Sequence, residues 1–177
     1  MPTCSRCGLA ALVLLALAFT GCDTNNGGSG ALGDLEGVYA LAELRFDPNT
    51  TALPDADIAA RYDLDNTTLE IFGEDNEALL RSQRLGGGSR RTDLEVRVFS
   101  NSVEFTALTA DDEEDLAELF LPRQFRLAFS SPAESATELR AEPDLFLSNV
   151  NLEAFNPDLY EDQVSVNGRL AVSFRRP

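Results

Sequence analysis

The sequence contains no histidine, no lysine and no tryptophan, and only three of its 177 residues are cysteine. Without histidine the chain has no Ser-His-Asp triad, no imidazole general base and no histidine-ligated metal site. Without lysine it has no amine that forms a Schiff base with a carbonyl substrate. Paired carboxylates can hydrolyse glycosides, but nothing singles out one pair among 30 acidic residues. We therefore expect a protein that is not an enzyme and uses no cofactor.

The first 21 residues have the organisation of a secretory signal. Arg6 supplies a positive charge beside the free amino group, and an unbroken apolar run of 11 residues extends from Leu9 to Phe19. A helix needs about 20 apolar residues to cross a bilayer, so this run is too short to span one. Its length is typical of the apolar core of a signal peptide. We expect residues 1–21 to be removed from the mature chain.

Phe19, Thr20, Gly21 and Cys22 resemble the lipobox of bacterial lipoproteins, although leucine is usual where Phe19 stands. The resemblance implies that the Cys22 thiol receives a diacylglyceryl group and that the chain is cleaved before it. Two or three acyl chains anchor a protein stably, whereas one holds it only marginally. The alternative is an ordinary signal peptide followed by an unmodified cysteine. The lipobox places the protein in the cell envelope, on the inner or the outer membrane, facing the periplasm or the exterior.

Cysteine usage agrees with this interpretation. Cys4 and Cys7 form a Cys-x-x-Cys pattern, but both belong to the expected signal peptide. If Cys22 carries the lipid, the mature chain has no free thiol. It then forms no disulfide even in an oxidising compartment.

The remaining chain divides into a tether and one domain. Residues 22–33 are rich in glycine, asparagine and serine, a composition typical of a flexible linker. Residues 34–177 have the length of a single domain and contain no internal repeat.

The mature chain is strongly acidic, with 13 arginines against 30 acidic residues and a formal charge of −17. This charge excludes nucleic acid as a partner, because nucleic-acid binding needs a basic surface. Anionic headgroups also repel the domain, so the lipid has to supply the attachment to the membrane. A lysine-free acidic composition suggests adaptation to high salt in a halophilic organism, and mutational bias alone is the alternative.

Eight segments have the pattern of β-strands. Between Val164 and Phe174 apolar and polar residues alternate, and Gly168 on the apolar face predicts a bend or bulge. In the first segment Val38, Ala40, Ala42, Leu44 and Phe46 share one face, although Leu41 weakens the contrast. The other six expected strands are Thr68–Phe72, Ala78–Leu85, Leu94–Phe99, Val103–Leu108, Gln124–Ser130 and Thr137–Ala141.

Three segments interrupt the strands. Residues 55–62 follow a proline and are compatible with a short helix, and the acidic start of residues 111–121 favours a second one. Residues 145–159 are less regular and are expected to cover one end of the sheet. The predicted fold is all-β, an eight-stranded antiparallel up-and-down barrel with one or two short helices. Two packed sheets in a β-sandwich are the alternative.

Metal sites are not expected. Residues 63–67 begin like a calcium-binding EF-hand loop, but Thr68 occupies the position that requires glycine for the sharp turn. The acidic run from Asp111 to Asp115 is interpreted as the solvated start of a helix.

Gly37-Val38-Tyr39 is similar to the opening of lipocalin-like bacterial lipoproteins, in which Gly-x-Trp or Gly-x-Tyr begins the first strand. The resemblance implies that Tyr39 closes one end of the barrel and meets an arginine of the last strand, for which Arg169 and Arg175 are the candidates. It also implies a non-enzymatic protein that binds a small hydrophobic ligand or lipid. An eight-stranded barrel can equally be filled by its own side chains. The alternative is therefore a structural or interaction protein of the envelope, with no ligand and with a partner that the sequence does not identify.

Overall fold

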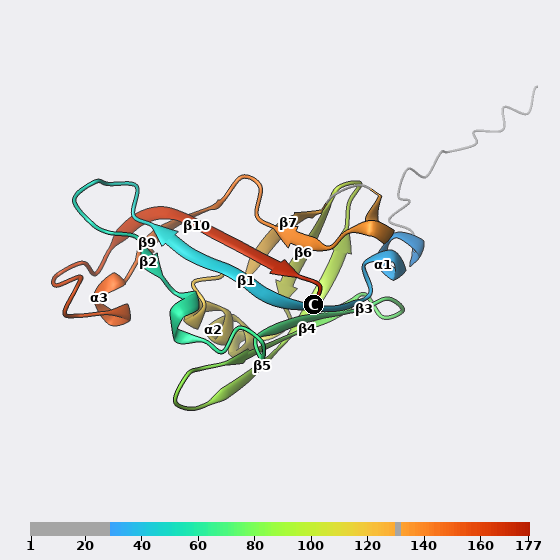
Figure 1. Cartoon of the computed structure of the whole chain (residues 1–177), viewed down its shortest axis with the longest axis horizontal. Helices are drawn as coiled ribbons and strands as arrows, with labels where there is room; N and C mark the ends of the chain where they lie inside the picture. The colour runs from blue at the N-terminus through green and yellow to red at the C-terminus, as the bar shows by residue number, and fades with distance from the viewer. Residues whose placement is uncertain (1–28, 130–131) are drawn as a thin grey trace, which may run out of the picture.

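A computed structural model describes residues 29–129 and 132–177 of the chain (Figure 1). Eight antiparallel strands pair in succession, and the last pairs with the first, so that the sheet closes into a barrel. The predicted all-β up-and-down barrel is confirmed, and the sandwich alternative is wrong. The barrel strands are β1 (Gly37–Asp47), β3 (Thr68–Phe72), β4 (Glu77–Gln83), β5 (Ser89–Val98), β6 (Ser102–Ala107), β7 (Gln124–Phe129), β8 (Glu138–Arg140) and β10 (Val166–Arg175).

Two further strands lie at the ends of the long β1–β10 pair. β2 (Ala56–Asp57) pairs with the end of β1, and β9 (Leu145–Val150) pairs with the start of β10. The helix expected over residues 55–62 is wrong, because β2 is followed only by a single 3-10 turn, η1 (Ala59–Arg61). β9 was not predicted, since its apolar residues do not alternate cleanly with polar ones.

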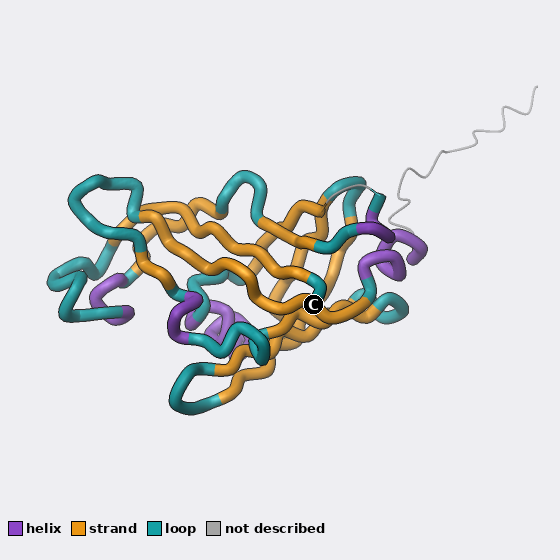
Figure 2. The backbone as a smooth tube through the Cα atoms, in the orientation of Figure 1, coloured by secondary structure: helices purple, strands orange, loops and turns teal. Residues whose placement is uncertain are grey.

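Short helices cap the barrel (Figure 2). α2 (Ala110–Glu118) confirms the helix predicted after the fifth expected strand, and α3 (Leu152–Phe155) follows β9. α1 (Ser29–Leu35) begins inside the segment expected to be a flexible tether, and its Leu32 and Leu35 are buried in the core. A second 3-10 turn, η2 (Ala133–Ser135), packs near α1.

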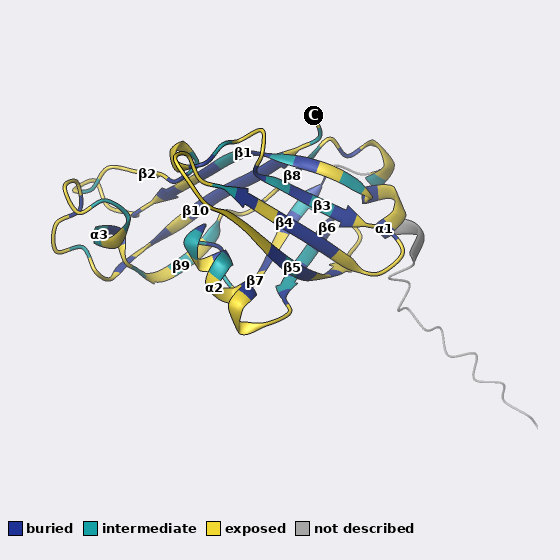
Figure 3. Ribbon diagram, turned by 90° about the horizontal axis from the view of Figure 1, so that it is seen from below, coloured by how far each residue is buried: buried dark blue, intermediate teal, exposed yellow. Residues whose placement is uncertain are grey.

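The centre of the barrel contains apolar side chains from all eight barrel strands. Figure 3 shows buried positions along the strands. Alternate residues point inward, as the period of two requires, and together they form one contiguous cluster. Phe105 and Phe125 stack across neighbouring strands with their ring centroids 5.2 Å apart. The inward-facing set includes Tyr39, Leu44, Leu69, Leu80, Leu94, Phe105, Leu127, Leu139 and Phe174.

A bulge changes the inward face of β1 halfway along the strand. The pairing of β1 with β10 shifts between Leu41 and Glu43. Before the bulge Tyr39 and Leu41 point inward, and after it Leu44 and Phe46 do. The single face expected from Val38 to Phe46 is therefore wrong for its first half, because one extra residue exchanges the two faces of a strand. The bend or bulge predicted at Gly168 adjoins a register shift between Val166 and Gly168, but the extra residue of that shift lies in β9.

The two ends of the barrel differ in construction. One end carries α1, η2 and the turns that join β3 to β4 and β5 to β6, and we call it the α1 end. The other carries α2, α3, β2 and β9, and we call it the α2 end.

No helix in the described ranges is long and apolar enough to cross a membrane.

Candidate functional site

Tyr39 and Arg176 form a lock at the α1 end. The Tyr39 hydroxyl donates a hydrogen bond to the Leu35 carbonyl at 3.0 Å. The guanidinium of Arg176 lies 5.0 Å from the centroid of the Tyr39 ring and donates to the carbonyls of Asp34 and Glu36 at 3.2 and 3.1 Å. Burial raises the pKa of Tyr39 even though Arg176 opposes the shift. This lock fastens α1 across the end of the barrel.

The lock uses a different arginine from those predicted. Arg175 points outward and pairs with Glu138 at 3.2 Å. Arg169 lies near the α2 end, opposite Phe146 in the sheet. The two-residue period of β10 could have identified Arg176, because Phe174 points inward and residue 176 shares its face. Gly37, the first residue of the predicted motif, has a φ of 136°, which favours glycine.

The structure does not describe the residues of the predicted lipobox. Phe19, Thr20, Gly21 and Cys22 lie outside the described residues, so the lipobox stays a prediction.

Phe120 closes the α2 end in a strained backbone conformation. It follows α2 with a φ of 59°, in the left-handed region that disfavours bulky side chains. The Phe120 amide donates to the Ala117 carbonyl and the Leu121 amide donates to the Leu116 carbonyl, both at 3.0 Å. These bonds form the helix-ending motif in which glycine is usual at the position of Phe120. A residue held in such a conformation costs about 1–3 kcal/mol and often marks a functional position.

The ring of Phe120 joins three parts of the chain. Its centroid lies 6.0 Å from that of Phe46 in β1 and 5.8 Å from that of Phe155 in α3, both in edge-on geometries. The guanidinium of Arg61 lies 3.8 Å from the centroid of the Phe155 ring. Aromatic pairs in this geometry are worth about 0.5–1.5 kcal/mol beyond the area they bury. The cluster explains how the strained Phe120 is held in place.

A hollow of about 580 Å³ lies beside Phe120, and we call it the distal groove. One wall is the segment that ends α2, and the other is β9 together with the start of α3. β9 is the last strand of the sheet and pairs only with β10, and its residues 146–150 line the groove. Phe146 in this wall is 65% exposed. The lining consists of Ala117, Phe120, Leu121, Pro122, Phe146, Leu147, Ser148, Asn149, Val150, Asn151 and Ala154.

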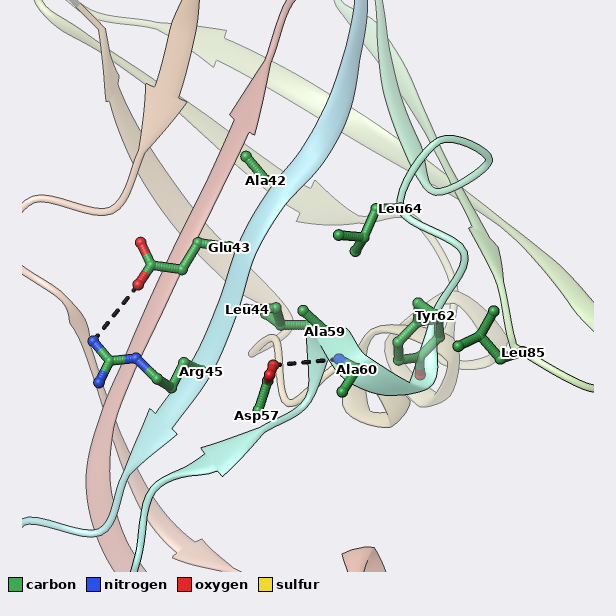
Figure 4. Close-up of a pocket in the computed structure, with 10 residues that line it drawn as sticks. All are labelled: Ala42, Glu43, Leu44, Arg45, Asp57, Ala59, Ala60, Tyr62, Leu64 and Leu85. Atoms are coloured by element: carbon green, nitrogen blue, oxygen red, sulfur yellow. Dashed lines mark hydrogen bonds and ion pairs between the residues drawn. The ribbon is translucent and has the colours of Figure 1, made fainter.

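A second hollow, of about 400 Å³, lies on the side of the barrel between β1 and the chain that follows β2 (Figure 4). Leu64 and Leu85 supply apolar surface there, but the lining also contains three charged residues, Glu43, Arg45 and Asp57. Of these, Arg45 pairs with Glu43 at 3.6 Å and also with Asp55 at 2.6 Å. A third hollow, of about 300 Å³, is lined by three arginines and four polar residues of β4, β5 and the loop before β3. Both hollows are therefore charged, which distinguishes them from the distal groove.

The acidic start of α2 is partly structural. Asp112 is buried, and its carboxylate accepts hydrogen bonds from the backbone amides of Asp93 at 2.9 Å and of Thr109 at 3.0 Å. Asp111 is exposed, as expected of a solvated helix start. The EF-hand-like segment instead forms a turn in which Asn66 donates to the Asp63 carboxylate at 2.8 Å. Among the described residues no cluster of histidine, cysteine, aspartate or glutamate is arranged to hold a metal ion.

Comparison of the chain with protein-family models, with curated proteins and with solved structures finds no match. The distal groove is the described hollow whose lining best suits a hydrophobic ligand. It is therefore the candidate functional site.

Proposed function

We propose that the chain is an exported, lipid-anchored β-barrel protein that binds a small hydrophobic molecule or lipid and catalyses no reaction. The distal groove is the observation that carries this proposal. Its volume of about 580 Å³ lies within the range of about 300–1,000 Å³ that small-molecule sites occupy. Its lining is mainly apolar, with a few polar groups. The ligand then sits on the outside of the barrel, because the chain's own side chains occupy the centre.

The anchor and the groove would lie at opposite ends of the domain. Cys22 precedes the start of α1 by seven residues, which reach at most about 25 Å when extended. A lipid on Cys22 would hold the α1 end near the membrane. The distal groove, at the α2 end, would then face the aqueous compartment and be accessible to a ligand there.

Replacement of Phe146 tests the binding site. The Phe146→Asp variant places a charge in the apolar wall, so we expect an apolar fluorescent probe to bind about tenfold more weakly. Phe72→Asp is the matched control, because Phe72 is an exposed phenylalanine at the α1 end of β3. Native mass spectrometry of the protein purified from its source should also detect a ligand bound to the unaltered chain. Equal probe binding by both variants would overturn the assignment of the groove.

Replacement of Cys22 tests the anchor. We expect the Cys22→Ser variant to incorporate no labelled palmitate and to leave the membrane fraction, because serine cannot form the thioether. Normal labelling of that variant would contradict lipidation at this residue. A Cys4→Ser variant is the control and should be labelled normally.

The filled barrel favours a second candidate, a structural or interaction protein of the envelope that binds no small molecule. Side chains from every barrel strand meet in one apolar core, so a partner would have to bind to the outer surface of the domain. Crosslinking in cells distinguishes the two candidates. Repeated capture of one envelope protein, with no ligand found by mass spectrometry, would favour the second.

A further inference from the structure

The distal groove has no charged residue in its lining, although a quarter of the chain's residues are charged and the mature chain carries −17. The other two hollows each contain three charged side chains. Resting on the proposed function, we propose that the groove selects uncharged amphiphiles with a hydrogen-bonding head and rejects amphiphilic anions such as fatty-acid carboxylates. An uncharged head needs no counter-ion in the groove, whereas a carboxylate does.

Neutral hydrogen-bonding groups lie beside the apolar wall. The Asn151 side-chain oxygen accepts a hydrogen bond from the Ala154 amide at 2.9 Å, and its amide nitrogen has no partner among the described residues. Ser148 is exposed in the same wall. In an antiparallel pair only alternate residues direct their backbone N–H and C=O groups to the partner strand, so the others in β9 point away from β10, in a strand whose residues 146–150 line the groove. These donors and acceptors suit an ester, amide or hydroxyl head.

Two arginines that adjoin groove residues in the sheet or in the chain each have an acidic neighbour. Arg169 is the cross-strand neighbour of Phe146, but its other neighbour across the sheet is Asp47. Arg123 follows the groove residue Pro122 and pairs with Glu113 at 3.6 Å. An anion in the groove would therefore meet the repulsion of the whole acidic domain with no lining cation to offset it. That repulsion is screened over about 10 Å at 0.1 M salt, so it weakens as salt rises.

Two ligands with the same acyl chain test the proposal. Binding of 1-monododecanoylglycerol and of dodecanoate to the mature chain carrying Cys22→Ser is measured by calorimetry at pH 8, below the concentrations at which they form micelles. In 50 mM salt we expect the monoglyceride to bind about tenfold more tightly. In 1 M salt the difference should narrow, mainly because the affinity for dodecanoate rises.

A cation placed in the groove should reverse the selection. Ala154 is exposed in the groove wall, so the Ala154→Arg variant should bind dodecanoate about tenfold more tightly and the monoglyceride with little change. Ala60→Arg, at an exposed position in η1, is the control and should leave both affinities close to those of the parent chain.

The outcomes separate this inference from the proposed function. Dodecanoate binding as tightly as the monoglyceride in 50 mM salt would overturn the selectivity while leaving a hydrophobic ligand site. Failure of both ligands to bind, together with no co-purified ligand, would instead overturn the proposed function.

Discussion

Gly168 allows β10 to pack closely against the end of β1. A Cβ atom at this position would overlap the carbonyl oxygen of Asp47 and the ring of Phe46, whose Cε2 would be 2.8 Å away. Real Cβ atoms do not approach other atoms so closely. The ring of Phe46 lies over the glycine and also contacts Phe120, so this close approach connects the register shift between β9 and β10 to the closure of the α2 end.

We expect Gly168→Ala to lower the free energy of unfolding by about 3 kcal/mol, because the backbone or the Phe46 ring has to move. Gly87→Ala is the control, since a Cβ there meets nothing within 4 Å, and it should change stability by less than about 0.5 kcal/mol. Urea unfolding monitored by circular dichroism measures both. Equal stabilities for the two variants would show that the barrel accommodates the methyl group without cost.

At the scale of the element, α2 is held by its first turn as well as by its apolar face. The Thr109 side chain accepts a hydrogen bond from the Asp112 amide, and the Asp112 carboxylate accepts one from the Thr109 amide, which is a capping box. The same carboxylate reaches the Asp93 amide in β5. Asp112 therefore fixes the helix start and attaches it to the barrel wall.

Removal of this carboxylate should destabilise the protein measurably. We expect Asp112→Ala to cost about 2 kcal/mol, because it removes the cap and leaves backbone amides without acceptors. Asp111→Ala removes an exposed carboxylate from the same turn and should cost less than about 0.5 kcal/mol. Thermal unfolding of the two variants at matched pH provides the comparison. Equal losses would mean that the helix needs only negative charge at its start.

At the scale of the whole molecule, all three tyrosines of the chain donate a hydrogen bond from the hydroxyl to a backbone carbonyl. The hydroxyls of Tyr39, Tyr62 and Tyr160 donate to the carbonyls of Leu35, Glu118 and Pro54 at 3.0, 3.1 and 3.2 Å. Burial raises the pKa of each hydroxyl above its ordinary value. These bonds tie α1 to β1, α2 to the segment between η1 and β3, and the loop before β2 to the segment that follows α3. Each bond requires a protonated tyrosine.

The raised pKa values set the response of stability to alkaline pH. In the folded state the tyrosines keep their protons at a pH where the unfolded chain loses them, near its ordinary pKa of about 10. The folded state then binds more protons, so stability falls as pH rises above about 10. Between about pH 6 and 9 the melting temperature should stay nearly constant, because the chain has no histidine or lysine. A series of melting temperatures from pH 7 to 11.5 checks both ranges, and an unchanged value above pH 10.5 would contradict the prediction.

Local patterns in the sequence sufficed to predict most of the barrel. Each of the eight barrel strands carries its own alternation or β-rich composition, and α2 begins with acidic residues that favour a helix start. The composition likewise limits the available chemistry. The absence of histidine and lysine excludes imidazole general bases and lysine Schiff bases, however the chain folds. The lipobox is another local pattern, so lipidation of Cys22 stays a prediction from residues 19–22.

Features that depend on contacts between distant segments could not be predicted. The inward face of β1 changes at a bulge that is set by its pairing with β10, about 130 residues later in the chain. The arginine that meets Tyr39 is Arg176, whereas the resemblance indicated Arg169 or Arg175.

The distal groove exists only because Phe120, at the end of a helix, lies across from β9, which begins 25 residues later. Sequence periodicity reports which face of one element is apolar, and it identified the strands for that reason. The closure of the whole sheet decides which elements lie opposite each other and what hollow remains between them.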